Sequence, residues 1–104
     1  MKQPAIYIVA SDRHGTLYVG VTSNLIQRAW QHRTGALPGF TRRYGCKILV
    51  YFEQFEDMPA AIARERQLKS GTRRAKIALI ERLNPHWHDL YDELAGISSP
   101  AGDF

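Results

Sequence analysis

Short β-rich runs alternate with helix-like segments along this chain, and the alternation predicts a small mixed fold. Residues 5–10 (AIYIVA) and 16–21 (TLYVGV) are rich in β-branched and aromatic side chains, and the polar or turn-forming residues 11–15 join them. This arrangement predicts a β-hairpin with a loop of about four or five residues. Residues 46–55 (CKILVYFEQF) predict a third strand, apolar enough to be central in a small sheet.

Three segments, 24–33, 57–70 and 73–83, have helical periodicity with start and stop signals at their ends. A short Arg-rich segment precedes the third strand, and a last short helical stretch runs to about residue 94. The order β-β-α-β-α-α predicts an α+β fold, in which helices flank a small three-stranded, mainly antiparallel sheet. The expected N-caps are Thr22 or Ser23, Asp57 and Thr72, and the expected helix-ending residues are Gly35, Gly71 and Asn84.

Length and composition fit one soluble domain. The chain has 104 residues, of which 44% are hydrophobic and 23% charged, and no apolar run approaches the ~20 residues that span a bilayer. We expect a single domain over residues 1–95, a loose tail over 96–104, and a cytoplasmic, nucleoid-associated location with no membrane contact. Cys46 is the only cysteine, which excludes an internal disulfide and a Cys-based zinc module.

The charges are unevenly distributed. Residues 13–82 hold 13 of the 14 Lys and Arg but five acids, a net charge of +8, whereas residues 83–104 hold four acids and no Lys or Arg. This asymmetry predicts a face that binds a polyanion and an acidic C-terminal segment lying apart from it, available to a protein partner. Because ten of the basic residues are Arg, which can bind phosphate oxygens in pairs, nucleic acid is favoured over a membrane surface; a merely solvated basic surface is the alternative.

A carboxylate, Glu65, lies in the middle of the apolar face predicted for the segment 57–70. Burying an unpaired carboxylate costs several kcal/mol, so such a position is usually held by a partner or by a function such as metal binding. From this helix alone, a Glu at the edge of the apolar face paired with an arginine explains the position equally well. The other members of that face are Met58, Ala61, Ile62 and Leu68.

Two further pairs of side chains are candidates for chemistry. With a four-residue hairpin loop, Tyr7 and Tyr18 lie on the same face of the sheet, together with Gly20, which leaves room for an approaching group. On the first helix, Arg28 and His32 are four residues apart and therefore adjacent, suited to holding a phosphate and moving a proton. The alternatives are two packing tyrosines and an exposed pair on an ordinary amphipathic helix.

Taken in order, these residues resemble the motifs of the GIY-YIG endonuclease superfamily. The resemblance covers roughly residues 4 to 92, and three segments are similar to the compact, single-domain bacterial (UPF0213-like) members: YVGVTSNLIQRAWQH, ARERQLKSGTRRAK and LNPHWHDLY. It implies the GIY-YIG nuclease-like fold. The matching positions are Ala5-Ile6-Tyr7, Tyr18-Val19-Gly20, Arg28, His32, Glu65 and Asn84.

The resemblance implies metal-dependent hydrolysis of DNA phosphodiester bonds. Glu65 would hold one Mg²⁺ (or Mn²⁺), which suits a hard oxygen ligand whose remaining positions are filled by water and substrate. By the same resemblance Tyr7 is the general base, with its pKa depressed by Arg28 or the metal, and Tyr18 positions water or phosphate.

The remaining site residues have supporting roles in this comparison. Arg28 stabilises charge in the transition state, His32 hydrogen-bonds Tyr7 or relays its proton, and Asn84 supports the site structurally. As an alternative, Asn84 simply ends a helix before Pro85.

Some positions depart from the family pattern. Ala5 and Val19 are mild changes, but Val21 stands where one branch has a Lys, which puts activity in doubt unless another cation replaces it. Arg42, Arg43 and Lys69 are the candidates for that replacement.

The expected ligand is branched, damaged or single-stranded DNA, with RNA as a further possibility, recognised by shape and charge rather than by base sequence. A non-catalytic nucleic-acid-binding module of the same fold is the alternative function. Phe40 and Tyr44 are candidates for stacking on an unpaired base. Besides Gly20, the candidates for nucleic-acid contact are Arg13, Arg42, Arg43, Arg64, Arg66, Lys69, Arg73, Arg74 and Lys76.

Overall fold

A three-stranded antiparallel sheet forms the centre of the computed structural model, which describes residues 3–96. The strands are β1 (Ala5–Ala10), β2 (Leu17–Thr22) and β3 (Ile48–Gln54), in the order β2-β1-β3. The predicted α+β class and antiparallel sheet are therefore confirmed. The prediction that the third strand is central was wrong, because β1 occupies the centre and β3 an edge. The apolar run of β3 is instead buried by elements that cover both faces of the sheet, while its polar end reaches Glu53 and the exposed Gln54.

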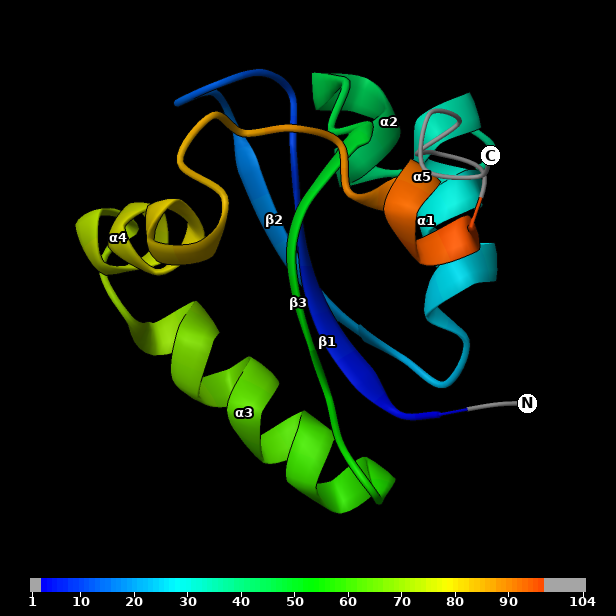
Figure 1. The fold of residues 1–104 in the computed structure, drawn as a ribbon, viewed down its shortest axis with the longest axis vertical. Helices are drawn as coiled ribbons and strands as arrows, with labels where there is room; N and C mark the ends of the chain where they lie inside the picture. The colour runs from blue at the N-terminus through cyan, green and yellow to red at the C-terminus, as the bar shows by residue number, and fades with distance from the viewer. Residues whose placement is uncertain (1–2, 97–104) are drawn as a thin grey trace, which may run out of the picture.

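Helices cover both faces of this sheet (Figure 1). On one side lie α3 (Met58–Ser70) and α4 (Arg73–Leu83), and on the other lie α1 (Leu25–Thr34), α2 (Phe40–Tyr44) and α5 (Tyr91–Ala95). The Arg-rich segment expected before β3 is the short helix α2. Among residues 3–96, no helix has the length and hydropathy needed to cross a bilayer.

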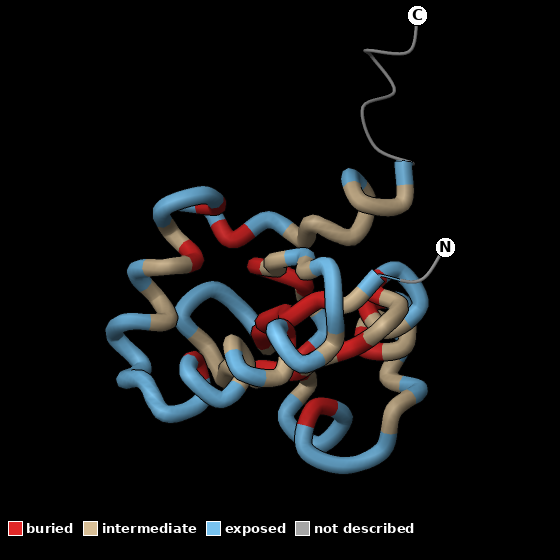
Figure 2. Tube along the Cα trace, turned by 90° about the horizontal axis from the view of Figure 1, so that it is seen from below, coloured by how far each residue is buried: buried red, intermediate tan, exposed pale blue. Residues whose placement is uncertain are grey.

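Alternation along the buried strand β1 divides the core into two clusters. Ile6, Ile8 and Ala10 pack in the cluster on the side of α3 and α4, whereas Tyr7 and Val9 pack with the residues of α1 and α5. The buried positions are concentrated along the strands in the middle of the molecule (Figure 2). Successive side chains of a strand point to opposite faces, so Tyr7 belongs to a different layer from its neighbours in sequence.

The hairpin has the expected register. Ser11 donates its backbone N–H to the Thr16 carbonyl at 3.0 Å, which encloses a four-residue loop. Tyr7 pairs with Gly20, and Val9 pairs with Tyr18, so both tyrosines lie on the α1 side of the sheet as predicted. The Arg73 guanidinium of α4 donates to the loop carbonyls of His14 and Gly15 at 2.6 and 2.7 Å and fixes the loop to the helix.

Most helix boundaries follow the expected caps. The Asp57 and Thr72 side chains accept hydrogen bonds from the first-turn amides of α3 and α4, and Gly35 ends α1 in a left-handed conformation. The cap predicted at Thr22 or Ser23 was wrong, because Asn24 caps α1. The buried Thr22 hydroxyl instead accepts from the Asn24 amide and so orients the capping residue.

The acidic C-terminal segment is bound to its own domain. Arg33 of α1 donates to the Asp92 carboxylate at 2.7 Å, and Asp89 accepts from the backbone amide of Leu49 in β3. The Asp92 contact holds α5 against α1, and the Asp89 contact attaches the segment to β3, while its availability to a protein partner stays a prediction. The predicted tail from residue 97 onward, including Asp103, lies outside the described residues.

Candidate active site

Two tyrosines from the paired strands β1 and β2 form the base of the site. The ring centroids of Tyr7 and Tyr18 are 6.4 Å apart, and Gly20 lies directly across from Tyr7. A Cβ atom on Gly20 would overlap the Tyr7 phenol oxygen and ring. Glycine is therefore required at position 20 to admit the phenol, which is a packing role rather than contact with an incoming ligand.

The buried imidazole of His32 connects the phenol to α2. Its Nε2 lies 2.9 Å from the Tyr7 hydroxyl, and its Nδ1 lies 3.1 Å from the Thr41 hydroxyl. Since His32 is 3% exposed, these two bonds fix the ring in one orientation. Thr41 was not a predicted site residue. It carried no sequence signal, because its contact arises from the turn that brings α2 back onto α1.

Burial sets the protonation of this pair. It raises the pKa of Tyr7 to about 12, with Arg28 beside it offsetting only part of the effect. Burial, together with the Arg28 charge, also lowers the pKa of His32 to about 4. Of the two groups expected to depress the tyrosine pKa, Arg28 lowers it but is outweighed by desolvation, and the effect of a bound metal stays a prediction. At neutral pH both groups are uncharged, and a proton on Nδ1 lets His32 donate to Thr41 and accept from Tyr7.

Arg28 and Tyr18 complete the walls of a cavity of about 250 Å³ in front of the pair. Arg28 is half-buried, and its Nε donates to the Gln31 side chain at 3.2 Å. A guanidinium held in this way at the wall of a cavity suits an anionic ligand such as a phosphate group. The cavity is lined by Tyr7, Tyr18, Arg28, His32, Leu37, Pro38, Phe40 and Thr41.

Glu65 reaches this region from the other side of the sheet, on α3, which packs against β2 and β1. Its side chain is 16% exposed, and its carboxylate lies 3.2 Å from the Lys69 ammonium one turn later. The Glu65 charge contributes to the raised pKa of Tyr7, which places the carboxylate within electrostatic reach of the phenol. The carboxylate on the apolar face is thus both paired, with Lys69 rather than an arginine, and adjacent to the site.

Lys69 also supplies a cation beside Tyr18. Its Nζ lies 5.7 Å from the centre of that ring. Of the three candidates to replace the cation missing at Val21, Lys69 is therefore the one that contacts the tyrosine pair. Arg42 and Arg43 are exposed on α2 and line a neighbouring pocket.

Asn84 lies away from the cavity. Its buried side-chain amide donates to the backbone carbonyls of Val50 at 3.1 Å and His88 at 2.9 Å, and its oxygen accepts from the His88 amide. These bonds attach the turn after α4 to β3. The contacts are those of a structural residue, which agrees both with the supporting role that the resemblance implies and with the helix-ending alternative.

The basic residues fall into two groups. Some of them bind other groups of the protein. Arg64 forms a bidentate ion pair with Glu53, and Arg73 donates to carbonyls of the hairpin loop. Lys76 donates to the Gly71 carbonyl. Their role is structural, which the sequence alone did not distinguish from a role in binding. The exposed members of the predicted set are Arg13, Arg42, Arg43, Arg66, Lys69, Arg73 and Arg74, of which Lys69 and Arg73 also make the contacts described above.

Comparison with known proteins gives one consistent result. The GIY-YIG catalytic domain, which belongs to a nuclease family, matches residues 3–78. A UPF0213 protein of Clostridium perfringens is 43% identical over 65 residues, covering 62% of this chain and 70% of the relative. A UPF0213 protein of Streptococcus sanguinis is 33% identical over 81 residues, covering 78% of this chain and 93% of the relative.

The fold agrees with this result. The solution NMR structure of a UPF0213 protein from Bacillus halodurans matches with a TM-score of 0.52 and 25% identity, covering 88% of this chain and 96% of that one. The chain therefore belongs to the GIY-YIG family, in its compact UPF0213 branch.

Proposed function

We propose that this protein is a metal-dependent endonuclease that hydrolyses DNA phosphodiester bonds and recognises the structure of its substrate rather than its sequence. The observation that carries the proposal is the hydrogen-bonded Tyr7–His32 pair at the wall of a cavity that Arg28 also lines. A proton acceptor and a phosphate-binding cation thereby face the same small volume, on a domain of a nuclease family.

The residues present fit one divalent metal ion held by Glu65. Among residues 3–96, no three His, Cys, Asp or Glu side chains gather to hold a metal between them. A single, largely buried carboxylate is nevertheless a normal protein contribution to a Mg²⁺ site, because water and substrate phosphate complete the shell. The metal would supply Lewis-acid stabilisation of charge on the phosphate. Lys69 would release Glu65 when the ion binds, since both compete for the same carboxylate.

The Tyr7–His32–Thr41 chain provides a path for one proton. When the attacking water loses its proton to the Tyr7 oxygen, Tyr7 passes its own proton to Nε2 of His32. The imidazolium that results keeps its bond from Nδ1 to Thr41. The pKa of His32 in the ligand-free protein is about 4, so the imidazole accepts a proton poorly at neutral pH. The negative charge of a bound phosphate is needed to raise this pKa and favour the transfer.

Two cations would stabilise the transition state. Arg28 faces the cavity from α1, and Lys69 lies beside Tyr18 at the edge of β2. Once released from Glu65, the Lys69 ammonium would be available to the phosphate, taking the place of the cation missing at Val21. Branched, damaged or single-stranded DNA of the repair or recombination type fits a small basic domain with few elements able to enter a groove.

The experiment is cleavage of labelled single-stranded, duplex, flap and four-way-junction DNA in Mg²⁺ or Mn²⁺. We expect cleavage of at least one structured or single-stranded substrate, and its loss in EDTA. If none is cut while binding persists and falls steeply with salt, the protein is a nucleic-acid-binding module and the proposed catalysis is refuted.

A further inference from the structure

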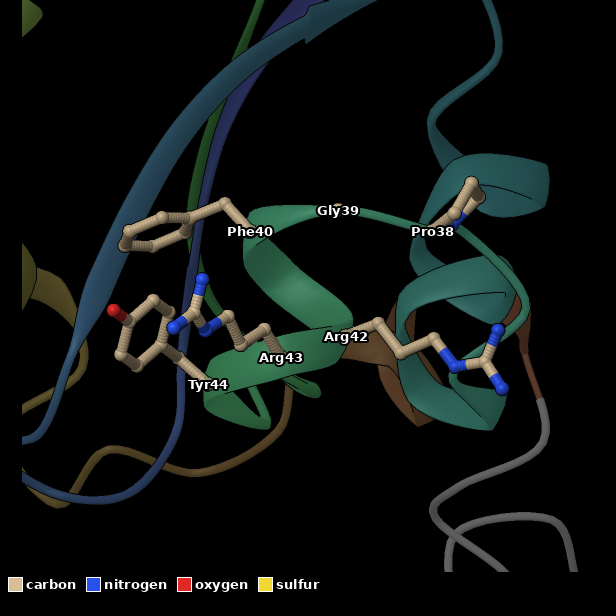
Figure 3. A pocket seen from close by; sticks show the side chains of 6 residues that line it. All are labelled: Pro38, Gly39, Phe40, Arg42, Arg43 and Tyr44. Atoms are coloured by element: carbon tan, nitrogen blue, oxygen red, sulfur yellow. The ribbon is translucent and has the colours of Figure 1, made fainter.

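A second pocket lies beside the candidate active site and is formed by the short helix α2 and the turn before it. We call it the α2 aromatic pocket; it is open to solvent and has a volume of about 760 Å³ (Figure 3). Its lining residues are Pro38, Gly39, Phe40, Arg42, Arg43 and Tyr44.

Two aromatic rings are exposed side by side in this pocket. The ring centroids of Phe40 and Tyr44 are 4.6 Å apart, and the two residues are 46% and 47% exposed. Thr41 is the buried residue of α2, so the helix is attached through its small polar side chain while both large rings face outward. Together the two rings form an exposed apolar surface, and such surfaces are typical of binding sites.

The pocket is positively charged. The Arg43 guanidinium lies over the Tyr44 ring at 5.6 Å, and Arg42 extends from the opposite side of the helix (Figure 3). Residues 36–47 contain no Asp or Glu. A ligand for this surface therefore combines a flat apolar face with negative charge, which is the chemistry of a nucleotide.

The pocket is continuous with the catalytic cavity. Phe40 and Pro38 line both, and the Phe40 ring is stacked near Tyr18 with centroids 6.0 Å apart. A strand whose phosphate occupies the cavity between Tyr7 and Arg28 would therefore place a neighbouring nucleotide at Phe40.

We propose that the α2 aromatic pocket binds one unpaired nucleobase of a DNA strand, next to the phosphate that is cleaved. Both faces of a base inside a duplex are covered by its neighbours, so a base reaches these rings only where the strand is single or distorted. Single-stranded DNA, or the single-stranded part of a flap, is therefore the substrate class. The location of the cleaved phosphate rests on the proposed function, whereas base binding in the pocket does not.

Binding in EDTA tests this inference without catalysis. The affinity of the full chain for a single-stranded oligothymidylate and for a duplex of equal length is measured by fluorescence anisotropy, together with the variants Phe40→Leu and Tyr44→Leu, which keep apolar bulk but lose the ring. Each variant is expected to bind the single strand at least about fivefold more weakly, the factor that ~1 kcal/mol per stacked base represents, with a smaller effect on duplex.

Matched controls separate stacking from general surface effects. Trp30→Leu removes an equally exposed ring from α1, and Arg82→Gln removes an exposed charge from α4. Both controls are expected to bind single-stranded DNA within twofold of the wild type. Equal weakening for single strand and duplex in the pocket variants, or no weakening, would overturn the proposal. Stronger binding of a matched RNA strand, lost in the same variants, would overturn the assignment to DNA.

A photocrosslink locates the base directly. An oligonucleotide with one 5-iodouracil, irradiated with the protein in EDTA, is expected to attach to Phe40 or Tyr44, and attachment elsewhere would refute the site. These results do not depend on cleavage. A protein that stacks the base but cuts nothing would refute the proposed function alone, and one that cuts without using the rings would refute this inference alone.

Discussion

The two faces of the sheet each contain a buried tyrosine in a polar cluster, and the two clusters differ in what the tyrosine is bonded to. On the α1 side, the Tyr7 hydroxyl contacts a neutral imidazole and faces a cavity. On the α3 side, the Tyr51 hydroxyl donates to Glu53, whose carboxylate forms a two-pronged ion pair with Arg64 at 2.9 Å for both bonds.

Burial raises the pKa of both tyrosines to about 12, so a perturbed pKa does not distinguish them. The Tyr51 cluster satisfies its own charges within the protein. In the Tyr7 cluster, the Arg28 guanidinium donates to the Gln31 side chain, and the Glu65 carboxylate is paired with Lys69, which is 48% exposed. If the proposed function is right, the comparison teaches that a catalytic cluster is recognised by groups left available to a ligand rather than by unusual acidity.

The largest expected difference between the two clusters is in the role of their carboxylates. We expect Glu65→Gln to reduce the rate of DNA cleavage by about 100-fold or more, because it removes the only metal ligand proposed, whereas Glu53→Gln leaves the rate of the folded protein within a few-fold of the wild type. Single-turnover rates in Mg²⁺ measure both. Equal loss in the two variants, with folding verified by circular dichroism, would contradict the assignment.

The pH dependence of stability distinguishes the histidine of the Tyr7 cluster. The pKa of His32 falls from 6.5 to about 4 on folding, so between these values the unfolded chain binds more protons than the folded protein. Stability is therefore expected to be lost as pH falls from about 6.5 towards 4, by up to ~3 kcal/mol from this residue.

Urea unfolding of the wild type and His32→Asn between pH 4.5 and 7.5 measures this effect. The variant should show a shallower dependence than the wild type, and His14→Asn, on the exposed hairpin loop, serves as the control. Identical slopes for the wild type and His32→Asn would show that His32 does not carry the effect.

The structural cluster should dominate stability at neutral pH. Arg64→Met leaves the Glu53 carboxylate, about three-quarters buried, without its partner and is expected to reduce the free energy of unfolding by ~2 kcal/mol. Lys69→Met removes a single contact at 3.2 Å between Glu65 and a side chain that is 48% exposed, whereas Arg64 binds Glu53 through two nitrogens at 2.9 Å, so Lys69→Met should cost less, ~1 kcal/mol. Denaturant unfolding compares them, and the reverse ranking would invalidate this distinction.

A smaller effect concerns the metal itself. Because Lys69 competes with a cation for Glu65, Lys69→Met is expected to bind Mn²⁺ about two- to fivefold more tightly than the wild type, corresponding to ~0.5–1 kcal/mol. Electron paramagnetic resonance of free Mn²⁺ measures the affinity without DNA, with Lys76→Met as the control. Unchanged or weaker binding in Lys69→Met would place the metal elsewhere.

Much of the fold was predictable because its signals are local. Helix caps at Asp57 and Thr72, the four-residue hairpin loop and the shared face of Tyr7 and Tyr18 all follow from residues close in sequence. The position of β3 at the edge was not predictable, because burial by helices on both faces makes an edge strand as apolar as a central one.

The site residues that belong to sequence motifs could be predicted, because the spacing of each motif places its side chains on a known face of a strand or helix. The Tyr7–His32 bond was anticipated, but Thr41 was missed, since its bond to His32 depends on how the turn before α2 folds back onto α1. Likewise, no pattern in the sequence separates Arg73, which binds the hairpin loop, from Arg74 beside it. The burial that raises the pKa of Tyr7 was also missed, because it depends on packing between the sheet and α1 rather than on the neighbouring charge of Arg28.

The most direct test of the central claim is the single-turnover rate of DNA cleavage in Tyr7→Phe and Tyr51→Phe at saturating Mg²⁺. Both substitutions remove one buried hydroxyl with the same perturbed acidity, so they differ only in the cluster to which it belongs. The account predicts a loss of about 100-fold or more for Tyr7→Phe and a rate within a few-fold of the wild type for Tyr51→Phe. Similar rates in the two variants would contradict it.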